Sequence, residues 1–171
     1  RRRCDPQGRP GRLVNEMSNV ALLTPKKDKG PVVITTTKGK ENVTHCTLAM
    51  VKPAEGPVNS DFGVRRAPGK RAAEKFHKGI DIGAKRGSDV VAAASGKVVF
   101  TGKKRGYGNT VEIEHGNGVT TRYAHLDRIL VSEGQSVDQA TRIGLVGRSG
   151  HTTGANLHFE LIALGKPINP I

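Results

Sequence analysis

The chain has 171 residues, which is enough for one well-packed domain with some additional chain and too few for two large domains. It carries 28 Lys and Arg against 15 Asp and Glu, a net charge of +13, which favours an anionic partner such as nucleic acid, anionic lipid or an anionic cell wall. No run of about 18 apolar residues is present, so we expect no membrane-spanning segment. Basic residues are not interleaved with aromatics, so we expect no nucleic-acid partner.

Residues 1–52 differ in composition from the rest of the chain, and we expect a basic arm followed by a β-hairpin. They carry 11 basic and 4 acidic residues, against 17 and 11 in residues 53–171. The stretch from Pro31 to Val51 is rich in β-branched residues around the turn-forming letters KGKEN, which is typical of a hairpin. We predict that this segment is a regulatory cover for a second unit, residues 53–171.

The two cysteines, Cys4 and Cys46, both lie in this first segment. An even number of cysteines in an exported protein permits a disulfide, and two unpaired thiols are the alternative. Their spacing does not fit a zinc knuckle, and the sequence alone leaves their pairing open.

From Pro53 onward, short β-branched runs alternate with Gly, Asn or Ser turns. The run TVEIEH alternates with the period of a strand, so Val111 and Ile113 should face one side of a sheet and Glu112 and Glu114 the other. Strands this short and this frequent predict an all-β fold, an antiparallel sandwich or partly open barrel with a groove.

Two of the six histidines lie in patterns that suit a metal ion. In FHKGIDIG, His77 and Asp81 are four residues apart, a spacing that puts both side chains on one face of either a helix or a strand. In NLHFELI, strand alternation puts His158 opposite an apolar face and beside a cleft. Two imidazoles and a carboxylate suit zinc and leave a fourth position for water. Each motif alone is more typical of surface or hydrogen-bonded polar residues than of metal ligands.

A third motif, TTRYAHLDRIL, contains His125 on a predicted strand. If its face meets the metal, this imidazole can hydrogen-bond an attacking water or the oxyanion that forms. A hydrogen-bonded histidine at a strand end is the alternative.

Four stretches of the sequence together resemble one known family. HKGIDIG, GYGNTVEIEHGNGVTTRYAHL, VSEGQSVDQATRIGLVGRSG and TTGANLHFELIALGKPINP occur in this order between about Val58 and Ile171. They are similar to the lysostaphin-like, LytM-type zinc endopeptidases of peptidoglycan. The resemblance implies a β-rich groove that binds one zinc ion, a peptidoglycan substrate, and a periplasmic or extracellular location at the cell wall of a bacterium.

The resemblance also implies roles for single residues. His77 and Asp81 match the H-x-x-x-D motif that binds zinc, and His158 matches the second histidine of H-x-H, the third ligand. His125 matches a catalytic histidine in the Y-x-H-L strand. Asn156 stands where the family has its other catalytic histidine.

Asn156 is the departure from the family pattern that bears most on activity. An asparagine does not exchange a proton near neutral pH, and a positioned acid–base group typically contributes about 10²–10⁴ in rate. Three explanations stay open. Asn156 is an inactivating change in a true peptidase, or His151 in the SGHTTG loop substitutes for the missing imidazole, or the chain is a non-catalytic module that binds peptidoglycan or activates a partner hydrolase. His115 matches a turn and receives no catalytic role.

Overall fold

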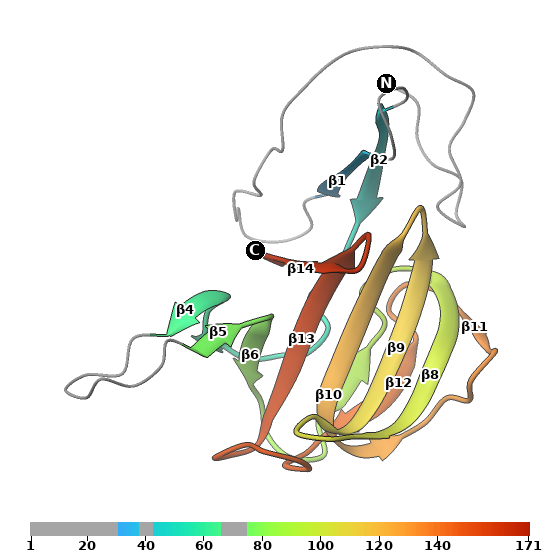
Figure 1. Cartoon of the computed structure of the whole chain (residues 1–171). Helices are drawn as coiled ribbons and strands as arrows, with labels where there is room; N and C mark the ends of the chain where they lie inside the picture. The colour runs from blue at the N-terminus through green and yellow to red at the C-terminus, as the bar shows by residue number, and fades with distance from the viewer. Residues whose placement is uncertain (1–30, 38–42, 66–74) are drawn as a thin grey trace.

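The structure is a computed structural model that describes residues 31–37, 43–65 and 75–171 (Figure 1). These residues form strands and no helix, which confirms the predicted all-β class. The first strands are β1 (Pro31–Thr37), β2 (Val43–Ala49), β3 (Val58–Ser60), β4 (Gly63–Arg65), β5 (Lys75–His77), β6 (Ile80–Gly83) and β7 (Asp89–Val91). The remaining ones are β8 (Gly96–Lys104), β9 (Gly108–Gly116), β10 (Val119–Ile129), β11 (Ser136–Val137), β12 (Arg142–Val146), β13 (Asn156–Ala163) and β14 (Lys166–Ile168).

One antiparallel sheet dominates the fold. Its strands run in the order β11-β8-β9-β10-β13-β6-β3, so β13, near the C-terminal end, lies between β10 and the much earlier strand β6. The long strand β10 pairs with β9 and β13 over its first half, then with β12 over its second half, and β12 in turn pairs with β7. The sheet therefore folds over on itself, and Figure 1 shows β12 behind β8 and β9.

The core lies between these two layers. Strand β9 alternates as the sequence predicts, because Val111 and Ile113 are fully buried while Glu114 on the other face is exposed. Apolar side chains of the second layer, Val90 and Ile143, belong to the same buried cluster. Burial of this apolar surface is the main force that holds the two layers together.

Strand β13 separates the core from the opposite, polar face. Leu157 and Leu161 are fully buried and Phe159 nearly so, and they form the apolar face that alternation predicts. The intervening side chains, among them His158 and Glu160, point away from that core face.

The predicted N-terminal hairpin is present as β1 and β2, which pair antiparallel from Pro31 opposite Ala49 to Thr37 opposite Val43. The chain just after the hairpin is tied to the β7–β8 turn, because the backbone N–H of Val51 donates a hydrogen bond to the carbonyl of Ala93, 2.8 Å away. The basic arm, the hairpin turn and the pairing of the two cysteines lie outside the described residues, so the division at residue 52 stays a prediction. Within the described part of the chain, no helix is long and apolar enough to cross a membrane.

Candidate metal centre

A groove of about 520 Å³ runs along the polar face of β13. Its walls come from β5 and the following turn, β6, the β8–β9 turn, β10, the loop that precedes β13, and β13 itself. The side chains that line it include all five residues for which the sequence predicts a site role: His77, Asp81, His125, Asn156 and His158.

Sheet register brings the three predicted metal ligands together. Asp81 on β6 lies directly opposite His158 on β13, although the two residues are 77 positions apart in sequence. His77 ends β5, just before the turn into β6. One donor atom from each of the three residues lies within 4.8 Å of the others. These are the only described residues that form such a group, and all three side chains are buried or half-buried.

The distances between these donor atoms fit a small tetrahedral ion. Nε2 of His77 lies 3.2 Å from Nδ1 of His158 and 3.2 Å from Oδ1 of Asp81, and Nδ1 of His158 lies 2.7 Å from the same oxygen. Ligands bound tetrahedrally to zinc at 2.0–2.1 Å are about 3.3 Å apart. Two imidazoles and one carboxylate therefore converge with nearly the spacing that zinc requires.

Hydrogen bonds on the outer side of each imidazole determine which nitrogen faces the centre. Nδ1 of His77 lies 2.7 Å from the carbonyl oxygen of Asp61, which only accepts, so Nδ1 carries the proton and Nε2 presents a lone pair. Nε2 of His158 lies 3.0 Å from Oε1 of Glu160, and its Nδ1 lies 2.7 Å from Oδ1 of Asp81. With the proton of His158 on Nε2, a cation would replace the hydrogen bond between Nδ1 and Asp81, and two lone pairs and a carboxylate oxygen would face that cation.

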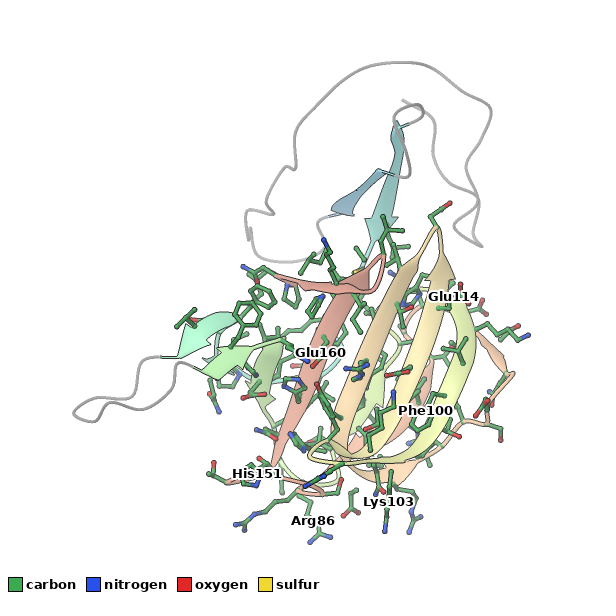
Figure 2. All side chains as sticks on the ribbon, in the orientation of Figure 1. Arg86, Phe100, Lys103, Glu114, His151 and Glu160 are labelled. Carbon is green, nitrogen blue, oxygen red and sulfur yellow. The ribbon has the colours of Figure 1, made fainter. Side chains whose placement is uncertain are left out.

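The carboxylate behind His158 is itself held by a buried polar network. Glu160 is fully buried, and its oxygens accept hydrogen bonds from the Tyr107 hydroxyl at 2.8 Å and from Nη1 of Arg122 at 2.6 Å. Burial alone raises the pKa of Glu160, but the hydrogen bond from His158 and the charge of Arg122 outweigh it, and the pKa is lowered. Glu160 is therefore a fixed negative charge behind the metal centre; Figure 2 shows it on β13.

The electrostatics of His158 also favour a cation. Burial lowers its pKa, but the hydrogen bonds and charges of Asp81 and Glu160 more than compensate, so the pKa is raised. Without a metal, this imidazole holds a proton more tightly than an exposed histidine does. The centre attracts a positive charge, whether a proton or a metal ion.

His125 lies beside the three ligands without being one of them. Its ring centroid is 5.8 Å from that of His158, and its Nδ1 lies 2.7 Å from the carbonyl oxygen of Ser149. That bond fixes the proton on Nδ1 and leaves Nε2 as an acceptor for a group in the groove. Burial lowers the pKa of His125, which favours the neutral ring.

The backbone at His125 is strained. Its φ is 61°, in the left-handed region that non-glycine residues rarely adopt, and the register of β10 shifts there as the strand leaves β13 for β12. The fold maintains this conformation with a hydrogen bond from the His125 N–H to the carbonyl of Tyr107 at 2.8 Å. Such strain is often found where a side chain must be aimed at a reaction site.

Asn156, His151 and His115 do not belong to the group of three donors. Asn156 is half-buried and lines the groove, and its Oδ1 accepts a hydrogen bond from the Thr152 hydroxyl at 3.2 Å. His151 is exposed and also lines the groove. His115 is buried in the core, away from the groove lining.

The supporting residues are those that sequence patterns do not reveal. Strand alternation along β13 places Glu160 on the same face as His158, but nothing in the sequence assigns Glu160 a role. Arg122 lies opposite Glu160 only because β10 pairs with β13 in that register. The carbonyl oxygens of Asp61 and Ser149 carry no sequence signal at all.

A comparison of the sequence with models of protein families finds a match. The model of Peptidase family M23 covers residues 75–170, more than half of the chain and all of the groove residues named above. The chain belongs to this family. The predicted lysostaphin-like resemblance is thereby confirmed, and the catalytic domain of lysostaphin from Staphylococcus simulans superposes with a TM-score of 0.60 at 26% identity, over 67% of this chain and 89% of that one.

Relatives in the family carry different descriptions. The DD-carboxypeptidase/endopeptidase Mpg of Neisseria meningitidis is 44% identical over 67% of this chain and 26% of its own length. The murein hydrolase activator NlpD of Escherichia coli is 40% identical over 70% of this chain and 29% of its own length. A zinc-containing peptidase from Vibrio cholerae has a TM-score of 0.64 at 34% identity, over 68% of this chain and 37% of that one. The chain thus spans about a quarter of the length of the curated relatives.

Proposed function

We propose that this chain is a zinc-dependent endopeptidase that cuts peptide cross-links of bacterial peptidoglycan, at the cell wall in the periplasm or outside the cell. The observation that carries this proposal is the convergence of three lone-pair donors in a groove beside a fourth, non-ligating imidazole. Relatives described as endopeptidases support the reaction class. The net charge of +13 suits an anionic wall, and adhesion through it should weaken with salt.

His77, Asp81 and His158 would hold the zinc ion, which when bound lowers the pKa of a water molecule and polarises the scissile carbonyl. The Asp61 carbonyl and Glu160 keep the two imidazoles oriented towards the ion. These residues are the part of the machinery that binds and orients.

His125 is placed to handle a proton. Because its Nδ1–H donates to Ser149, the neutral ring accepts at Nε2 a proton from the water that attacks the carbonyl. The imidazolium that results places a positive charge near the oxyanion. Delivery of a proton to the leaving amine is the step that the asparagine at position 156 cannot perform.

A second candidate is a module that activates a partner hydrolase without cutting the wall. The relatives described as hydrolase activators and the presence of Asn156 favour it. We expect an activator to lose metal ligands, because metal binding is no longer needed once the chemistry is gone. All three predicted ligands are present here. The peptidase is therefore the function that the geometry supports better.

The test is turnover of purified peptidoglycan by this chain and by its Asn156→His variant, with zinc content measured on both. We expect about one zinc per chain in both proteins, measurable cleavage by the natural sequence, and a gain in the variant of up to about 10²–10⁴. Absence of both zinc and cleavage from the two proteins would support the activator. In that case, the chain should stimulate a separate cell-wall hydrolase.

We further propose that residues 1–52 regulate access to the groove. None of the described residues of this segment lines the groove, and the chain after its last strand is hydrogen-bonded to the β7–β8 turn at Val51 and Ala93. The proposal therefore depends on the basic arm. Unaltered turnover and substrate affinity after removal of residues 1–30 would count against it.

A further inference from the structure

Hydrolysis of a peptide bond requires two proton transfers, and His125 is placed in the groove for the first, which takes a proton from the attacking water. A base takes a proton from the attacking water, and an acid gives a proton to the leaving amine. His125 has its Nε2 free to act as the base. The inference about the side chain that gives a proton to the leaving amine rests on the proposed peptidase function.

The titratable side chains that line the groove can be eliminated one by one. His77, Asp81 and His158 direct their donor atoms at the metal centre. Lys78 is exposed and carries an ammonium group rather than an imidazole.

Two further groups are engaged behind the metal centre. The hydroxyl of Tyr107 donates its hydrogen bond to Glu160. Glu160 is fully buried, and its oxygens already accept hydrogen bonds from Tyr107, Arg122 and His158. Among the described residues that line the groove, this leaves His125 and His151 as imidazoles outside the metal site.

The backbone next to His151 is fixed rather than loose. Gly150 has φ +76°, and a Cβ there would lie 2.4 Å from the backbone nitrogen of Gly108, so the loop packs directly against the β8–β9 turn. The N–H of His151 donates to the carbonyl of Gly106 at 2.8 Å. The loop is thus tied to the wall of the groove at the residue that carries the imidazole.

The side chain of His151 remains available. It is exposed, it lines the groove together with Asn156, and Figure 2 shows it in the loop below β13, at the end of the strand where Asn156 begins it. His125 lines the same groove, so both imidazoles face one cavity. A second proton-exchanging group therefore exists in the groove, on the loop rather than on β13.

We propose that His151 is the catalytic acid of this groove and takes the place of the imidazole that position 156 lacks. The attacking water gives a proton to Nε2 of His125 as the new C–O bond forms. The C–N bond then breaks, and the imidazolium of His151 gives its proton to the amine nitrogen. His125 afterwards releases its proton to solvent and His151 regains one, so the net change is the addition of one water to the peptide bond.

The test compares His151→Gln with Arg148→Gln, a charged-to-amide change in the same loop at an exposed residue that does not line the groove. We expect His151→Gln to lower kcat by about 10²–10⁴, with KM and zinc content unchanged, and Arg148→Gln to behave as the natural sequence does. Adding Asn156→His to His151→Gln should restore part of the lost rate. Equal activity of His151→Gln and the natural sequence would overturn the role of His151 and leave the peptidase function standing.

The other outcomes separate the two proposals. If the zinc-loaded natural sequence is inert and Asn156→His is active, the groove lacks a second acid and His151 does not supply it. If both are inert with zinc bound, the peptidase function fails, and the role of His151 fails with it.

A readout without catalysis uses the zinc-free chain. The ring ¹⁵N resonances of His151 should shift when soluble peptidoglycan fragments are added, because the side chain contacts a ligand in the groove. Resonances that stay unchanged while those of His125 shift would overturn the proposal.

Discussion

Two buried histidines of this molecule differ in what surrounds them. His158 and His115 are 6% and 2% exposed, and both ring nitrogens of each have polar partners. His158 faces the carboxylates of Asp81 and Glu160 at 2.7 and 3.0 Å. His115 faces the carbonyl of Ser95 and the hydroxyl of Thr121 at 2.8 and 2.6 Å. Burial lowers the pKa of His115, whereas the carboxylates raise that of His158.

The comparison shows that burial alone does not mark a functional histidine. Neutral partners satisfy the hydrogen-bonding needs of a neutral ring and leave it a structural part of the core. Carboxylate partners create a site in which a positive charge is stabilised. We therefore expect substitutions at the two residues to have different consequences, although both disturb a buried imidazole.

The largest expected difference concerns metal binding. His158→Gln removes one of three donors, so zinc content should fall from about one per chain to near zero and wall cleavage should be lost. His115→Gln should retain zinc. Metal analysis after dialysis, with circular dichroism to confirm folding, checks both. A folded His158→Gln protein that keeps its zinc would show that the metal lies elsewhere.

A smaller effect on zinc binding is expected from a substitution of Glu160, which bonds the predicted ligand His158. Glu160→Gln should weaken zinc binding by about 10–100-fold, because the carboxylate that orients His158 and adds negative charge is lost. Glu112→Gln is the matched control, since Glu112 bonds the other side of Arg122 and does not touch His158. Competition with a chelator measures both affinities. Equal weakening by the two variants would mean that the whole network, rather than Glu160, supports the metal.

The strands, and the motifs that contain the three predicted ligands, could be identified from the sequence because their signals are local. Alternation assigns Val111, Ile113 and Leu157 to the core, and their burial confirms it. The spacing of His77 and Asp81, and the place of His158 on the polar face of its strand, are likewise visible within a few residues. The family resemblance then supplies the grouping of the three, and the register of β6 with β13 brings them together.

The residues that support the predicted ligands could not be identified from the sequence, because their contacts join distant parts of the chain. Arg122 and Glu160 are 38 residues apart, and only the register of two strands makes them partners. The left-handed backbone of His125 arises where β10 changes partners, which is a property of the closed sheet. Sequence alternation specifies which face a side chain takes and leaves open which strand lies next to it.

Zinc should also stabilise the fold, and only through the site at His158. A ligand that binds the native state at about 100 times its Kd contributes about 2.7 kcal/mol, which for a chain of this size corresponds to a rise in Tm of about 5–10 °C. Thermal unfolding with and without zinc, before and after a chelator, measures the rise. His158→Gln should show none and His115→Gln the full rise. The same rise in both variants would mean that zinc acts elsewhere on the protein.

The smallest expected effect is a difference in pH dependence between the two histidines in the zinc-free chain. The pKa of His115 is lowered in the native state, so as pH falls through about 6.5 the unfolded chain binds a proton before the native chain does, and stability decreases. The pKa of His158 is raised, so its contribution to the free energy of unfolding is fully present below about pH 6.5 and is lost as pH rises through the raised pKa.

Urea unfolding between pH 5 and 8 of the natural sequence and each Gln variant isolates the two contributions. The stability that His115 provides over Gln should shrink towards acid, and that of His158 should shrink towards alkali. Parallel curves for the two variants would mean that the carboxylates around His158 do not set its charge, and the distinction between the two sites would fail.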